Sequence, residues 1–217
     1  IAPEHVVRRA QQNFERFSPI TETVESMLET IAREAHTIIK LHQASSKKEP
    51  HSTMVALVIT PEKSAIWAHV GDSRLYRFDG PNFAERTIDH SYVEKLIGEG
   101  SLTKEEAKNH RLSNILVNVL GIDTSELFVT IKRYDGLKAG DSFLLCSDGL
   151  SHYFGDTELG AAIAMNSPRQ ASEMLIKKAR ERAVGSVADN CTMAIVKLVP
   201  PPAEVKDYTA QKMRRAV

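Results

Sequence analysis

Apolar residues recur at helical spacing over the first forty positions. Before the "SP" pair at 18–19, the recurring residues are Val6, Ala10, Phe14 and Phe17. After it, one longer stripe contains Val24, Met27, Leu28, Ile31, Ala32, Ala35, Ile38 and Ile39. Spacings of three and four place such residues on one face of a helix. The pattern predicts two helices that pack against a sheet.

From Thr53 onward the pattern changes to short runs rich in β-branched and aromatic residues. The first three are "TMVALVIT", "SAIWAHV" and "RLYRF", separated by "PEK" and "GDS" and followed by "DGPN". Gly, Pro, Asp and Ser between such runs are typical of tight turns. These runs are predicted to be neighbouring antiparallel strands.

Helices and strands then alternate irregularly towards the C-terminus. Helices are predicted in "SYVEKLIGEG", in "LTKEEAKNH", where Thr103 and Glu106 have capping-box spacing, and from Ser167 and Pro168 to about Gly185. Further strands are predicted in "LFVTIKRY", "DSFLLCS" and "CTMAIVKLV". Because a parallel sheet would require regular βαβ alternation, this order favours an α+β layered domain built on antiparallel sheets. We expect one domain over residues 1–199 and a tail without chemistry over 200–217.

Composition and charge narrow the functional classes. The chain has 217 residues, 42% of them hydrophobic, with 28 basic and 28 acidic side chains. No basic stripe favours a nucleic-acid partner, and no apolar run reaches the roughly 18 residues that cross a bilayer. We therefore expect a monomeric cytoplasmic protein with no nucleic-acid or membrane partner. The two cysteines, Cys146 and Cys191, are expected to be free thiols.

Four aspartates stand at the ends of apolar runs or just beyond turn residues: Asp72, Asp89, Asp148 and Asp189. Each alone is most simply a turn or cap residue that bonds nearby backbone N–H groups. Asp148 follows a predicted strand, however, and Asp189 precedes one. A sheet that places those strands side by side would bring both carboxylates to one edge.

Clustered carboxylates repel one another unless a positive charge lies among them. Mg²⁺ and Mn²⁺ are bound by such oxygen clusters, with water in the remaining positions, and a metal-bound water is a nucleophile near neutral pH. The residues therefore leave two interpretations open, a metal site and a set of turn or cap residues.

Four segments resemble, in order and approximate spacing, the motifs of the metal-dependent PP2C-type protein phosphatases, particularly the bacterial branch. They are "GDSRLYRF" (71–78), "DHSYVEKLIGEGSLTKEEAKNH" (89–110), "LKAGDSFLLCSDGL" (137–150) and "DNCTMAIVKL" (189–198). The resemblance implies an α-β-β-α sandwich of two antiparallel sheets flanked by helices. It also implies a centre with two or three Mg²⁺ or Mn²⁺ ions, and attack of metal-activated water on phosphoserine or phosphothreonine in a phosphoprotein.

The resemblance also implies roles for single residues. Asp148 corresponds to a ligand of the second metal, and Asp189 to its acidic partner on the following strand. Asp89 resembles a residue that holds a third, weaker ion together with Asp148. Asp72 is interpreted as structural support of the site, with Arg74 as its ion-pair partner.

The sequence departs from the family pattern in one important place. The family's bridging aspartate lies in an Asp-Gly-Met-Gly-Gly-like segment, preceded by an acidic ligand and a phosphate-binding arginine, and the printed sequence contains none of these. The resemblance places this segment just before Ile1, so the present chain is expected to be weakly active or inactive alone. The segments "HSTM" and "HRLSN" also differ from the family pattern, in the region expected to contact substrate.

Other enzyme classes are disfavoured by missing motifs. The sequence has no Asp-x-Asp of a haloacid-dehalogenase-type phosphatase, no P-loop, and no Cys-x5-Arg loop following Cys146. The alternative that stays open is a PP2C-fold pseudophosphatase that binds a phosphoprotein or another partner without hydrolysis. A cognate Ser/Thr kinase is a further candidate partner.

Overall fold

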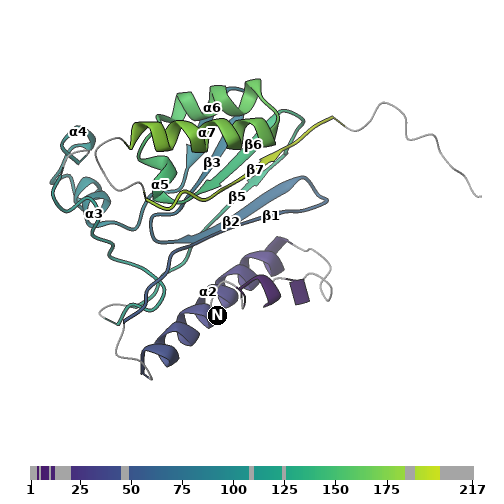
Figure 1. Cartoon of the computed structure of the whole chain (residues 1–217). Coiled ribbons are helices and arrows are strands. Elements are labelled where there is room, and N and C mark those ends of the chain that lie inside the picture. The colour runs from purple at the N-terminus through teal and green to yellow at the C-terminus, as the bar shows by residue number, and fades with distance from the viewer. Residues whose placement is uncertain are drawn as a thin grey trace, which may run out of the picture.

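The computed structural model of the chain (Figure 1) describes residues 4, 6–9, 11–12, 21–44, 49–107, 110–123, 126–183 and 189–200. Its strands form two antiparallel sheets that pack face to face, and helices cover both outer faces. The predicted α+β class and the α-β-β-α layers are therefore confirmed.

The first sheet has the strand order β1 (Met54–Ile59), β2 (Ser64–Val70), β5 (Thr130–Asp135). All seven residues of β2 are buried because this strand is central and is covered on both faces. The run "SAIWAHV" predicted this strand with its observed bounds. Residues 71–73 then lead directly into the second sheet.

The second sheet has the order β4 (Asn82–Arg86), β3 (Arg74–Asp79), β6 (Asp141–Cys146), β7 (Met193–Lys197). Strand β4 was not predicted from the sequence. Its burial pattern explains why, since three of its five residues are exposed and no apolar alternation marks it. The predicted turn before it is present at residues 80–81.

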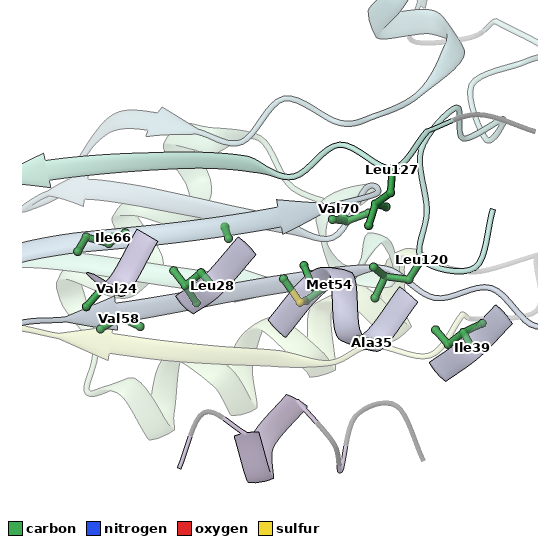
Figure 2. Packing of buried hydrophobic residues seen from close by; sticks show 12 residues of the cluster. Val24, Leu28, Ala35, Ile39, Met54, Val58, Ile66, Val70, Leu120 and Leu127 are labelled. Carbon is green, nitrogen blue, oxygen red and sulfur yellow. The ribbon is translucent and has the colours of Figure 1, made fainter. Parts of the chain in front are cut away.

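Helix α2 (Thr21–Ala44) covers the outer face of the first sheet (Figure 1). Its apolar stripe packs on β1, β2 and the loop that precedes β5, as Figure 2 shows for Val24, Leu28, Ala35, Ile39, Met54, Val58, Ile66, Val70, Leu120 and Leu127. Residues 6–9 and 11–12 are also helical, and Val6 contacts the same cluster. The other residues of the first predicted stripe, Ala10, Phe14 and Phe17, lie outside the described residues.

Three helices form the opposite outer layer: α5 (Asp148–Ser151), α6 (Asp156–Met165) and α7 (Pro168–Arg182). The start of α7 is as predicted, with Ser167 as its N-cap in a complete capping box with Gln170. Its buried residues are Ala171, Leu175 and Ala179. Helices α5 and α6 were not predicted, and Gly185, the expected residue after α7, lies outside the described residues.

Helices α3 (Tyr92–Gly98) and α4 (Lys104–Ala107) project beyond the ends of the strands (Figure 1). Both were predicted. Ser91 caps α3 by accepting a hydrogen bond from the backbone N–H of Glu94 at 3.3 Å. Thr103 and Glu106 form the predicted capping box, in which the Thr103 N–H donates to Glu106 Oε2 at 2.9 Å and the Glu106 N–H donates to Thr103 Oγ1 at 3.3 Å.

The interior between the two sheets contains the buried residues Ala65, Trp67, Leu75, Leu137 and Phe143. The start of β3 pairs with the end of β6, with Arg74 opposite Cys146, so the turn after β2 lies next to the end of β6. Both cysteines are free thiols, as predicted. Within the described ranges, no helix is long and apolar enough to cross a membrane.

Candidate metal centre

The adjacent ends of β6 and β7 bring the segments of Asp148 and Asp189 together. The strands are antiparallel, with Cys146 opposite Met193. Beyond this pair, the Ser147 N–H donates to the carbonyl of Thr192 at 3.0 Å. The Ser147 hydroxyl donates to the carbonyl of Asn190 and accepts from the Thr192 N–H, both at 3.1 Å. The predicted side-by-side arrangement of these two strands is confirmed.

Gly149 explains how the backbone at 189–190 comes so close to the end of β6. A Cβ atom at this position would lie 2.6 Å from the carbonyl oxygen of Asn190, a distance that real Cβ atoms do not adopt. The "SDG" sequence therefore permits a contact between backbones that any other residue after Asp148 would obstruct.

Both carboxylates are fixed locally by the backbone that follows them. Asp148 Oδ1 accepts the N–H of Gly149 at 2.8 Å, and Asp189 Oδ1 accepts the N–H of Asn190 at 2.7 Å. Asp148 is half-buried, whereas Asp189 is exposed. The two side chains thus stand at one edge of the sheet, with Asp189 nearer to solvent.

Asp72 joins Asp148 at this edge from the turn between β2 and β3. Burial raises the pKa of the Asp72 carboxyl, and the charges of Asp148 and then Asp89 raise it further. Gly71 makes the turn possible, because its φ of +100° is unfavourable for other residues and a Cβ there would lie 2.4 Å from Thr53 Cγ2. The sequence assigned Asp72 only a supporting role, whereas in the structure its carboxyl is near enough to Asp148 for the two charges to interact.

Arg74 pairs with Asp89, and the predicted pairing of Arg74 with Asp72 is wrong. The guanidinium makes a bidentate contact, from Nε to Oδ1 at 2.7 Å and from Nη2 to Oδ2 at 2.6 Å. Arg86 lies farther from the same carboxylate, at 3.7 Å. Both oxygens of Asp89 therefore accept charge-assisted hydrogen bonds in this arrangement. The cap at the start of α3 is Ser91, so Asp89 is not needed for that role.

Carboxylate oxygens are suitable ligands for a hard divalent cation, but the described side chains do not form a complete coordination shell. Among the described residues, no group of three or more His, Cys, Asp or Glu side chains is placed so that it could hold a metal ion. The structure thus does not gather Asp89, Asp148 and Asp189 into one ready-made site. Asp72 and Asp148 do repel each other electrostatically. Mg²⁺ is commonly held by only one or two carboxylates with water, so a cation here would relieve that repulsion.

Cys146 is not a nucleophile in this structure. Its side chain is 3% exposed, and burial raises the pKa of its thiol to about 12. The thiolate is the reactive form of cysteine, so this residue belongs to the apolar core beneath the site. Geometry and sequence agree in excluding Cys146 as the nucleophile of a phosphoryl transfer.

A polar cavity of about 740 Å³ lies between α3, α4 and the start of the α5–α6 connection. Its lining includes Arg74, Arg86, Asp89 and His152, together with Ser151, whose buried hydroxyl has no hydrogen-bond partner within the described structure. Arg86, Ser151 and His152 were not predicted as site residues. They come from segments whose sequence carries no motif of its own, and only the fold brings them together.

Comparison with known proteins identifies the family. The family model described as protein phosphatase 2C matches residues 1–183. Protein phosphatase PhpP of Streptococcus pneumoniae is 33% identical over 175 residues, which cover 79% of this chain and 68% of that protein.

Solved structures agree in fold. The serine/threonine phosphatase of S. agalactiae superposes with a TM-score of 0.80 at 25% identity, covering 91% of this chain and 81% of that one. The catalytic domain of the serine/threonine protein phosphatase PstP, solved in complex with two manganese ions, gives a TM-score of 0.75 at 23% identity over 92% of this chain and 81% of its own. With the family model matching most of its length, the chain belongs to the PP2C-type protein phosphatase family.

Proposed function

We propose that this protein hydrolyses phosphoserine and phosphothreonine in phosphoproteins with the help of divalent cations, Mg²⁺ or Mn²⁺. The observation that carries the proposal is the carboxylate edge, where Asp148, Asp189 and Asp72 stand at one end of the sheets. The polar cavity of about 740 Å³ reaches Ser151 and His152, at the end of the short helix that Asp148 begins. Membership of the PP2C family and the similarity to PhpP support the same activity.

Each acidic side chain has a distinct role in this proposal. Asp148 and Asp189 would hold a cation at the edge, and Asp72 would share a cation with Asp148. When bound, such an ion supplies a water of lowered pKa and neutralises charge on the phosphoryl group. Asp89 was expected to hold a third ion, but its ion pair with Arg74 favours a structural role in this arrangement.

Other residues of the chain would bind and orient the substrate. The guanidinium of Arg86 lines the polar cavity at 3.7 Å from both Asp89 and Glu94, and an anionic phosphate would compete with these long ion pairs for its positive charge. The exposed His152 lines the same cavity, and its charge partly offsets the rise in the pKa of Asp72 that burial and Asp148 cause. The segment from Ser91 to Ala107 forms the other wall, so it would contact residues flanking the phosphorylated side chain.

The test is phosphate release from a phosphothreonine peptide with Mn²⁺, with Mg²⁺ and after chelation. We expect slow, metal-dependent release that Asp148→Asn and Asp189→Asn both abolish, because each removes a charged oxygen ligand. Asp156→Asn, at the half-buried first residue of α6, serves as the control. Release that survives chelation would contradict the proposal. Binding of the peptide without any hydrolysis, in the presence of Mn²⁺, would favour the pseudophosphatase alternative.

A further inference from the structure

A second cavity, of about 670 Å³, lies on the other side of the segment that carries Asp89. Strands β2 and β5, the 87–91 segment and the start of α3 enclose it. Its volume falls in the range of small-molecule sites, which are typically apolar with a few polar groups. The residues that matter for its chemistry are Trp67, His69, Ile88, His90, Val117 and Phe128.

His69 presents an unused hydrogen-bond acceptor in the wall of this cavity. The side chain is only 2% exposed, and its Nε2 lies 2.9 Å from the carbonyl oxygen of Ile88. A carbonyl only accepts, so Nε2 carries the proton and Nδ1 of the neutral ring is an acceptor. Within the described structure, Nδ1 has no hydrogen-bond partner. An unpaired buried acceptor is costly, so a ligand that brings an O–H or N–H donor would gain a hydrogen bond at this atom.

The neighbouring His90 shows that this lack of a partner is specific to His69. Its Nδ1 accepts from the side-chain amide of Asn118 at 2.7 Å and from the N–H of Gly71 at 3.2 Å. Its Nε2 therefore carries the proton and donates to Thr130 Oγ1 at 3.0 Å. His90 is fully satisfied by the protein, whereas His69 is not.

Aromatic rings line one wall of the cavity. The rings of His69 and His90 are 4.3 Å apart between centroids, and those of His90 and Phe128 are 4.5 Å apart. Tilted rings at these distances form a continuous surface that favours packing of a further aromatic ring. At the mouth, Ile88 and Phe128 are 61% and 49% exposed, and the charged side chains of Lys95 and Lys132 stand beside them.

We propose that this cavity binds a small aromatic molecule that bears an O–H or N–H donor, with the ring against Phe128 and His90 and the donor on Nδ1 of His69. The proposal concerns binding and does not depend on phosphatase activity. Because Asp89 lines both this cavity and the polar cavity beside the metal centre, the ligand would lie against the segment that carries the Arg74–Asp89 ion pair.

Phenol and anisole are matched probes for this site. They share a ring, but methylation removes the donor from anisole. Trp67 is the single tryptophan of the chain and lines the cavity, so its fluorescence reports on occupancy. We expect saturable changes with phenol and a dissociation constant for anisole that is roughly fivefold higher, as the loss of one net hydrogen bond predicts. No saturable binding of phenol, or equal affinities of phenol and anisole, would overturn the proposal.

Substitutions in the cavity test where phenol and anisole bind. Phe128→Ala should weaken both probes several-fold, whereas Phe83→Ala, a 38% exposed phenylalanine on β4 that does not line the cavity, should leave both unchanged. His69→Phe should make phenol and anisole bind equally. Should His69→Phe fail to fold, the Phe128→Ala comparison decides. Full phenol affinity in Phe128→Ala, or a retained preference for phenol in folded His69→Phe, would contradict the assigned site.

Discussion

The ion pair between Arg74 and Asp89 could not be predicted from the sequence around either residue. Arg74 is two positions from Asp72 and fifteen from Asp89, yet its guanidinium bonds Asp89. Sequence proximity favoured Asp72. The guanidinium instead extends along β3 to the segment after β4, a strand that the sequence did not predict. The partner of Arg74 could therefore not be predicted without that strand.

Asp89→Asn separates a structural role from a metal-binding role for this residue. The Arg74 and Asp89 side chains are 18% and 12% exposed, so the substitution leaves a largely buried guanidinium without its charge partner. We expect the free energy of unfolding to fall by about 3 kcal/mol, measured by urea denaturation. Asp79→Asn, which breaks the exposed pair with Lys138, should change it by less than about 1 kcal/mol. If Asp89→Asn instead leaves the stability unchanged and abolishes Mn²⁺ binding, Asp89 is a metal ligand and the structural role is wrong.

His90 should make the protein less stable in mild acid. Burial, and then the neighbouring His69, lower the pKa of His90 from 6.5 to about 4. Between pH 6.5 and about pH 4, the His90 side chain is protonated in the unfolded chain but neutral in the folded protein. The stability of the folded protein therefore falls as the pH falls through this window. The largest contribution is about 3 kcal/mol.

The measurement is urea denaturation across this pH range for the wild type and for His90→Gln. The variant should lose this part of the pH dependence, whatever its stability at neutral pH. His51→Gln, at an exposed histidine, should retain it. A His90→Gln curve parallel to that of the wild type would show that His90 is not the group responsible.

At the scale of secondary-structure elements, the sequence predicted the helices and strands that have a clear apolar periodicity. It did not predict those that form only through contacts with other parts of the chain. Helix α2 and strand β2 follow from strong apolar patterns. Strand β4 is a polar edge strand, and α5 is a four-residue turn of helix whose start depends on the contact between Gly149 and the 189–190 backbone. Such elements exist because of their neighbours, so no local pattern could reveal them.

Gly149→Ala tests the contact that joins the two halves of the carboxylate edge. The added Cβ would lie 2.6 Å from Asn190 O, so the 189–190 backbone must move away. We expect a loss of about 1–3 kcal/mol in the free energy of unfolding, together with weaker Mn²⁺ binding. Gly98→Ala, at a helical position with open space around it, should be neutral or slightly stabilising. A Gly149→Ala variant as stable as the wild type would refute this account of the "SDG" sequence.

The packing of α2 gives a second prediction at this scale. Leu28 is 4% exposed within the cluster against the first sheet, so Leu28→Ala should destabilise the protein by about 2–5 kcal/mol. Leu41, on the same helix, is 68% exposed, and Leu41→Ala should cost less than about 1 kcal/mol. Thermal or urea denaturation of the two variants measures this difference, and equal losses would contradict the described orientation of α2.

For the molecule as a whole, the layers and the family were predictable, but the cavities were not. The resemblance rests on motifs near strand ends, and these positions determine the carboxylate edge. Most of the residues that line the two cavities lie between positions 86 and 132, mainly in the connection from β4 to β5, which has few regular elements. Their shapes depend on loop contacts such as those of Asn118 and His90, which no local sequence pattern encodes.

The most direct test of the central claim is calorimetric titration of Mn²⁺ into the wild type and into Asp148→Asn, with Asp156→Asn as the control. The account predicts saturable binding to the wild type and the control, and a loss of at least about tenfold in affinity for Asp148→Asn, since the amide is a poorer ligand for a hard cation. Equal binding to Asp148→Asn, or no binding to any of the three proteins, would contradict a metal centre at this edge.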